Sequence, residues 1–142
     1  MKNFYTGLMT YFNALSGGVH NSFYMDIGGR LYNTYAPDGT TLPYAVFQHI
    51  SSRPDDTFTE KLDEILIQFT IFSTSASSSE IHTAMVDLKA LFDKCTFSVT
   101  GATIVEFRRG GEGLTSEEFE TVDGLQRGWS YYIEYNALVR KT

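Results

Sequence analysis

Residues 62–92 read LDEILIQFTIFSTSASSSEIHTAMVDLKALF, and this stretch contains two different apolar periods. Its first part alternates apolar and polar side chains, as a strand with one buried face does, and the apolar members are Ile65, Ile67, Phe69 and Ile71. The second part repeats apolar residues at the spacing of an amphipathic helix: Ile81, Ala84, Met85, Leu88, Leu91 and Phe92. We therefore expect a strand followed by a helix that packs on its sheet.

A serine-rich run, residues 73–79, separates the expected strand from the expected helix. Such a composition occurs in flexible linkers between domains, and also directly before helices, where serine hydroxyls cap the first turn. The run ends in Ser79, immediately before the apolar period. This position favours a helix cap over a domain boundary.

A second helix is predicted over about residues 3–16, ahead of this unit. Its apolar stripe consists of Phe4, Leu8, Tyr11, Phe12 and Leu15, and Gly17 and Gly18 would end it. Residues 19–27 show no clear period and are interpreted as a connecting loop. The segment 36–39 has the proline and glycine of a type I turn, so we expect neighbouring strands over residues 31–35 and 44–50.

The C-terminal part is predicted to complete the sheet. Phe97 and Val99 begin an extended segment that Gly101 interrupts before it resumes over residues 103–108. Residues 110–128 are rich in glycine and acidic residues and are interpreted as a long loop. The last strand alternates from residue 129 to residue 139. The order of elements predicts a single α+β domain over residues 1–142, with an antiparallel or mixed β-sheet and two amphipathic helices packed on one side.

Composition narrows the possible functions. The chain has 142 residues, enough for a core that needs no disulfides, and its lone cysteine excludes an internal disulfide bond. The net charge of −6 argues against a dedicated nucleic-acid binder. No segment has the length and hydrophobicity of a membrane span or of a signal peptide, so we expect a protein of the reducing cytoplasm with no membrane partner.

No catalytic, metal or cofactor site is predicted from the residues. Cys95 would need a histidine to become a nucleophile, but no motif connects it to His20, His49 or His82, and Cys95, His49 and His82 are interpreted as packing or surface residues. The glycines of residues 110–113 beside two arginines follow neither the Walker nor the dinucleotide spacing. We therefore predict a protein that is not an enzyme and uses no cofactor.

The acidic loop predicted over residues 110–128 has two readings. Its carboxylates are Glu112, Glu117, Glu118, Glu120 and Asp123, and no basic residue follows Arg109 until Arg127. A loop of this charge repels phosphates and becomes ordered when a partner binds it. It is therefore either a disordered hairpin tip, or a docking arm or pore-lining loop.

Three segments carry a resemblance to a known family: GRLY at 29–32, APDG at 36–39 and LPYAVF at 42–47. Together with the ordered elements that follow, they resemble the tail-terminator proteins of long-tailed bacteriophages, also called tail-completion or head-to-tail joining proteins. The resemblance implies a non-enzymatic virion protein that is assembled in the bacterial cytoplasm as a ring, usually of six copies. Its implied partners are the major tail tube protein and the head–tail connector, and DNA would pass through the ring without specific binding.

Candidate contact residues follow from this expectation. Aromatic side chains dominate protein interfaces, which makes Phe72, Trp129 and Tyr132 interface candidates. The segment containing Arg53, Asp55 and Asp56 is the second candidate surface. Two alternatives remain at this point: another neck or tail component with the same fold, and a small dimeric ligand-binding or cysteine-dependent hydrolase-like domain.

Overall fold

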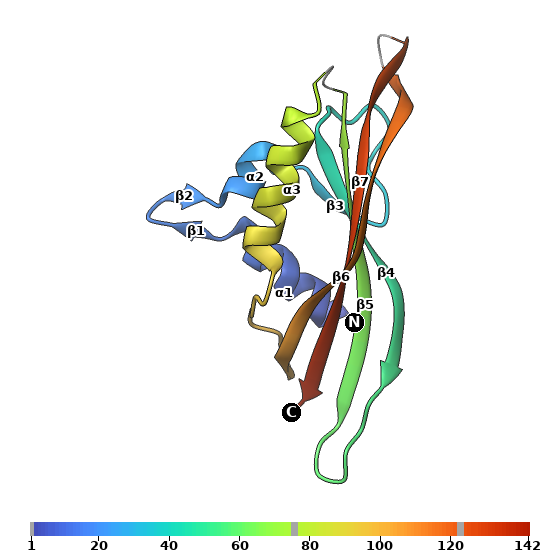
Figure 1. Cartoon of the computed structure of the whole chain (residues 1–142). Helices are drawn as coiled ribbons and strands as arrows, with labels where there is room; N and C mark the ends of the chain where they lie inside the picture. Colours follow the sequence, from blue (N-terminus) through green and yellow to red (C-terminus); the bar gives the residue numbers. More distant parts are fainter. Residues whose placement is uncertain (1, 75–76, 122–123) are drawn as a thin grey trace.

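The computed structural model describes residues 2–74, 77–121 and 124–142, and it shows a mixed five-stranded sheet with helices on one side (Figure 1). The strand order is β3-β4-β5-β7-β6. The sheet strands are β3 (Leu31–Asn33), β4 (Tyr44–Pro54), β5 (Leu62–Ser73), β6 (Ala102–Thr121) and β7 (Gly124–Lys141). The other described elements are α1 (Lys2–Asn13), β1 (Leu15–Ser16), β2 (Val19–His20), α2 (Ser22–Asp26) and α3 (Ser79–Phe92). The predicted single α+β domain is confirmed.

The central unit, β5 followed by α3, has the structure that its two apolar periods predict. β5 pairs in antiparallel fashion with β4 and β7, and its side chains at Ile67, Phe69 and Ile71 are fully buried. α3 buries its own stripe, Ile81, Ala84, Leu88 and Phe92, and the Phe92 ring lies 4.6 Å from that of Phe69. The helix begins at Ser79 rather than after it, and the side chain of the preceding Ser78 makes no capping hydrogen bond within the described residues.

The sheet is mixed because β3 and β4 run parallel. The two predicted neighbours do pair, with Leu31 opposite Ala45 and Asn33 opposite Phe47. The connection over residues 34–43 therefore returns the chain to the end of the sheet at which β3 began, instead of forming a hairpin.

The N-terminal region corrects three expectations. The first helix ends at Asn13, and Gly17 and Gly18 form the turn of the β1–β2 hairpin with φ of +60° and +80°, which glycine adopts without strain. The expected loop over residues 19–27 contains α2, which Asn21 caps by accepting a hydrogen bond from the Tyr24 amide (2.8 Å). The described chain thus has three helices instead of two, because a helix of five residues is too short to show a period.

The prediction of an acidic loop over residues 110–128 is also wrong. β6 continues to Thr121 and β7 begins at Gly124, so these residues pair as a long β-hairpin. A register shift between Arg109 and Glu112 accommodates Gly110 and Gly111, and the paired residues 113–121 and 124–132 form an extension that we call the β6–β7 arm. Backbone pairing does not depend on apolar side chains, which explains why a polar composition concealed two strands. The arm extends past the N-terminal end of α3 (Figure 1).

The alternation predicted for the last strand is confirmed. Its fully or almost fully buried side chains are Tyr131, Ile133, Tyr135, Ala137 and Val139. Gly101, with φ of +78°, forms a tight turn between Val99 and Ala102.

Candidate assembly surfaces

The face of the sheet opposite the helices carries a row of aromatic side chains. The register places Tyr44 opposite Phe72 and Thr70 opposite Tyr132, and the rings of Tyr32 and Phe72 lie 6.4 and 5.1 Å from that of Tyr44. We call Tyr32, Tyr44, Phe72 and Tyr132 the aromatic row. No helix of the described chain covers this face (Figure 1), and Tyr132 keeps 38% of its surface exposed.

Two of the three predicted aromatic contacts come together in this row. Phe72 and Tyr132 occupy adjacent strands on the helix-free face. Trp129 lies on the opposite face, because it belongs to the same alternation as the buried Tyr131, and it packs against the edge of the core. A single surface therefore contains the first two residues but not Trp129.

The second candidate surface lies at the opposite end of the sheet from the arm. Arg53 is in β4 and donates two hydrogen bonds to Glu64 (3.0 and 2.8 Å), yet its side chain remains 75% exposed. Asp55 and Asp56 lie in the following loop, where an Asp56 carboxylate oxygen accepts a hydrogen bond from the Leu62 amide (3.1 Å). These three residues are adjacent to one another and distant from the aromatic row.

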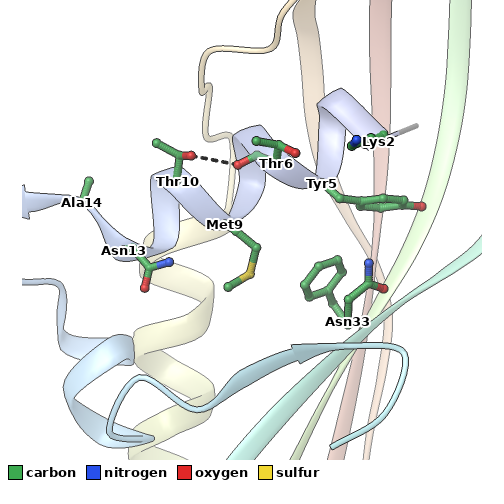
Figure 2. A pocket seen from close by; sticks show the side chains of 9 residues that line it. Lys2, Tyr5, Thr6, Met9, Thr10, Asn13, Ala14 and Asn33 are labelled. Atoms are coloured by element: carbon green, nitrogen blue, oxygen red, sulfur yellow. Dashed lines mark hydrogen bonds between the residues drawn. The ribbon is translucent and has the colours of Figure 1, made fainter.

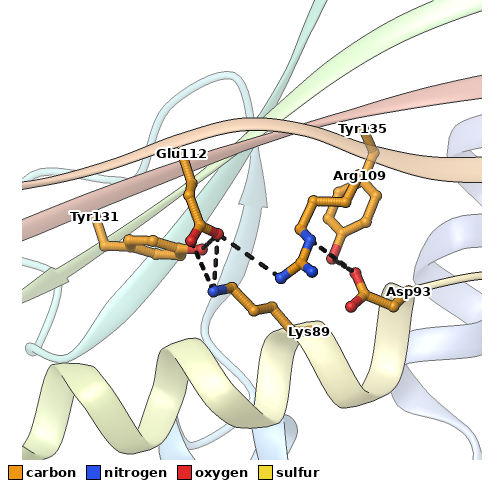
Figure 3. Close-up of polar contacts among 6 residues, drawn as sticks. All are labelled: Lys89, Asp93, Arg109, Glu112, Tyr131 and Tyr135. Carbon is orange, nitrogen blue, oxygen red and sulfur yellow. Dashed lines mark hydrogen bonds and ion pairs between the residues drawn. The ribbon is translucent and has the colours of Figure 1, made fainter.

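The predicted acidic residues divide into separate groups. Glu117 and Glu118 lie on the exposed β6–β7 arm, and Glu118 is 3.9 Å from Arg127. Asp123 lies outside the described residues, as does the side chain of Glu120. Glu112 points instead toward α3 and belongs to a polar cluster (Figure 3).

This polar cluster joins the base of the arm to α3. Glu112 accepts hydrogen bonds from the Lys89 ammonium (2.9 Å) and the Tyr131 hydroxyl (2.8 Å), and Tyr135 donates to Asp93 (2.7 Å). The Arg109 guanidinium lies between the two carboxylates, 3.8 Å from Asp93 and 4.0 Å from Glu112. The cluster could not be predicted from the sequence, because its residues come from separate elements that only the fold brings together.

The electrostatics of the cluster suit a structural role. The hydrogen bond from Lys89 holds the pKa of Glu112 below its ordinary value, so this carboxylate is charged. Burial, and then the hydrogen bonds to the carboxylates, raise the pKa of both Tyr131 and Tyr135 well above the ordinary value. Both tyrosines are therefore neutral donors, and the cluster holds the arm to the helix layer.

A pocket of about 890 Å³ lies between α1 and the edge of the sheet at β3 (Figure 2). Its walls include the Tyr5 ring, the Met9 side chain and the buried Phe47. Lys2 lies at the N-terminal end of the same helix and also lines the pocket. The pocket is thus mostly apolar, with one cation beside it.

Residues 25–127 match the family model described as "Tail completion protein gp17". The chain belongs to this family. The match spans more than half of the sequence, and it confirms the resemblance that the segments of residues 29–47 carry. This protein is accordingly a structural protein of the phage tail and a component of the virion.

Solved structures agree with this fold assignment. The chain is similar to one in the structure titled "Virion of native gene transfer agent (GTA) particle", with a TM-score of 0.60 and 8% sequence identity. The similarity covers 93% of this chain and 92% of the other. At this identity the likeness concerns the fold alone. No curated protein matches the sequence.

The surroundings of Cys95 give no support to the cysteine-dependent hydrolase alternative. The Cys95 side chain is only 7% exposed, and burial raises the pKa of its thiol to about 12. His49 and His82 are exposed, and the His20 ring stacks on that of Tyr24 with 3.6 Å between the ring centroids. Among the described residues, no three histidine, cysteine or acidic side chains gather as metal ligands, and no helix is long and apolar enough to cross a membrane.

Proposed function

We propose that this protein caps the phage tail tube as an oligomeric ring, which terminates tail assembly and joins the tail to the head connector. The ring would most simply contain six copies, as the family resemblance implies. The observation that carries this proposal is the aromatic row on the helix-free face of the sheet. In the monomer, one face of the sheet is covered by helices, and the other face is suited to contact other chains.

The row has the chemistry of a protein interface. Tyrosine presents a rigid apolar ring with a polar hydroxyl, so it is compatible with water in the free subunit. It contributes strongly to the binding free energy when a partner covers it. The helix-covered face already buries its aromatic residues, including Phe69, Phe92 and Tyr135. The remaining aromatic surface is therefore available to a neighbouring copy or to the tail tube protein.

Charge supports a channel function. Six copies at −6 each would give the ring a net charge of −36. An acidic ring repels the DNA backbone, so DNA can pass through it without binding. Glu117 and Glu118 on the arm add exposed carboxylates that suit such a lining.

The proposal is tested with tails produced in the absence of this protein. Adding the wild-type protein should give tails of uniform length with a cap at one end, visible by negative-stain electron microscopy, and should restore joining to heads. Tyr132→Arg places a charge in the aromatic row and should abolish both effects while the melting temperature stays close to that of the wild type. Tyr35→Arg is the matched control, since Tyr35 is a 76% exposed tyrosine outside the row.

Two outcomes would contradict the proposal. If tails remain of uncontrolled length when the wild-type protein is supplied, the protein does not terminate them. If an antibody against the protein labels assembled particles elsewhere than at the head-proximal end of the tail, the alternative of another neck or tail component with this fold is the correct one.

A further inference from the structure

The loop between β4 and β5 presents a fully exposed aromatic side chain. Phe58 lies at its tip with a relative exposure of 111%, so it makes essentially no contact with its own chain. The loop projects from the end of the sheet, beyond α1 (Figure 1). A phenylalanine in this position is unfavourable in water unless a partner covers it.

Hydrogen bonds across the loop fix the backbone on either side of Phe58. The Asp55 amide donates to the Leu62 carbonyl (2.8 Å), and the Thr57 amide donates to the Glu60 carbonyl (3.0 Å). In return, the Glu60 amide donates to the Thr57 hydroxyl (3.1 Å). The loop is therefore ordered in advance, which lowers the entropy cost of inserting its tip into a partner.

The pocket beside α1 has the complementary shape and chemistry. Its volume of about 890 Å³ is enough for an aromatic side chain and the loop backbone around it. In Figure 2 the Met9 side chain extends from α1 toward the strand edge, and the Tyr5 ring lies farther toward the N-terminal end of the same helix. Phe47 also lines the pocket but is fully buried, so the accessible apolar surface comes from the partly buried Tyr5 and Met9.

Charge is complementary as well. The loop carries Asp55 and Asp56 before its aromatic tip, with Lys61 as a partial counterweight, whereas the Glu60 carboxylate is paired with Arg140 of its own chain (3.1 Å). The pocket carries Lys2 at its edge. Opposite charges around an apolar centre guide association and fix orientation, so the loop and the pocket fit each other better than either fits a second copy of itself.

We propose that Phe58 of one copy inserts into the pocket formed by α1, β3 and β4 of the next copy. This contact rests on the proposed ring, and it names one of the surfaces that the ring uses. Because the loop and the pocket are different patches, each copy offers one of each, and the contact is heterologous. Such a contact repeats from copy to copy until the ring closes.

Photo-cross-linking tests the contact directly. Phe58→p-benzoylphenylalanine keeps an aromatic side chain at the tip, and the protein is irradiated on tail ends and digested for mass spectrometry. The expected cross-links join position 58 to residues 2–14 of another copy. The same probe at Tyr35 serves as the exposed control and should not label that segment, and adding Met9→Asp should remove the cross-link from position 58.

Substitutions give the matching functional readout. Phe58→Asp should leave the melting temperature unchanged, because the side chain has no intramolecular contacts to lose, and should weaken ring formation by on the order of tenfold or more. Tyr35→Asp is the matched control and should assemble normally. Lys2→Glu should weaken assembly several-fold, and combining it with Asp55→Lys should recover most of the loss.

The two proposals fail in different ways. A protein that caps tails normally, but whose position 58 cross-links only to the tail tube protein or connector, or to no chain, overturns this contact and leaves the ring intact. If Phe58→Asp assembles as well as the wild type, the contact is likewise overturned. If the wild-type protein neither caps tails nor self-associates, the proposed function itself is wrong.

Discussion

The two faces of the sheet are built from the same strands but differ in what they leave for other molecules. Along β5, Ile67, Phe69 and Ile71 point into the helix layer and are fully buried, whereas Thr70 and Phe72 point to the helix-free face and remain partly exposed. A strand has a period of two, so neighbouring residues serve different purposes. The covered face supplies the free energy of folding, and the helix-free face carries the aromatic residues that the proposed assembly would use.

The largest expected effect separates these two purposes. Phe69 contacts the rings of Phe92, Phe47 and Tyr135 at 4.6–6.2 Å, so Phe69→Ala should lower the free energy of unfolding by about 3–5 kcal/mol. Tyr132→Ala on the bare face should cost less than about 1 kcal/mol but should abolish tail capping. Urea denaturation measures the free energy of unfolding of both variants, and negative-stain electron microscopy measures capping. Equal losses of stability would contradict the division between the faces, and Phe69→Leu provides a milder core variant.

The next prediction concerns the close fit of α1 to the covered face. A Cβ atom at Gly7 would overlap the backbone oxygen of Ser98 and lie 3.2 Å from the Phe97 ring. Gly→Ala in a helix normally stabilises it by up to about 1 kcal/mol, but this overlap should reverse the sign and cost about 1–3 kcal/mol. At Gly111 a Cβ would meet only a Glu134 carboxylate oxygen, at 3.9 Å, so Gly111→Ala should change stability by less than about 0.5 kcal/mol. Stabilisation by Gly7→Ala would show that α1 packs less tightly.

How well the sequence predicts these regions depends on whether a pattern is local. The apolar periods over residues 62–92 identify β5 and α3, because burial of one side of an element requires apolar residues at a regular spacing in the sequence. The β6–β7 arm shows no such spacing, because backbone hydrogen bonds between polar strands do not require a side-chain pattern. Phe72 and Tyr132 were recognisable as candidates from residue type, but only the register shows that they adjoin and that Trp129 does not.

A smaller effect is expected from a carboxyl pair within the helix layer. Asp26 of α2 neighbours Asp87 of α3, and burial, followed by the interaction with this neighbour, raises the pKa of Asp26 from 3.8 to about 7. The folded protein therefore holds a proton that the unfolded chain releases between about pH 4 and 7. The contribution of this group to stability is complete below about pH 4, declines as the pH rises, and is lost above about pH 7.

Asp26→Asn should remove this pH dependence. The amide can donate to Asp87 at every pH, so the difference in unfolding free energy between variant and wild type should shift by about 1–2 kcal/mol in favour of the variant from pH 4 to pH 8, a value reduced for partial exposure. The measurement is urea denaturation at several pH values, with Asp38→Asn at an exposed position as the control. Parallel curves for wild type and Asp26→Asn would mean that the two carboxyl groups do not share a proton.

The smallest effect concerns two tyrosines of α1 whose hydroxyls differ in their partners. The Tyr11 hydroxyl donates to the Leu91 carbonyl (2.7 Å), so Tyr11→Phe should cost about 0.5–1.5 kcal/mol. The buried Tyr5 hydroxyl has no hydrogen-bond partner among the described residues, and burial raises its pKa to about 12. Tyr5→Phe should therefore leave stability unchanged or raise it by up to about 1 kcal/mol. If Tyr5→Phe loses as much stability as Tyr11→Phe, the Tyr5 hydroxyl is already hydrogen-bonded within the fold. If Tyr5→Phe keeps its stability but forms rings less well, the hydroxyl acquires its partner from the copy that fills the pocket.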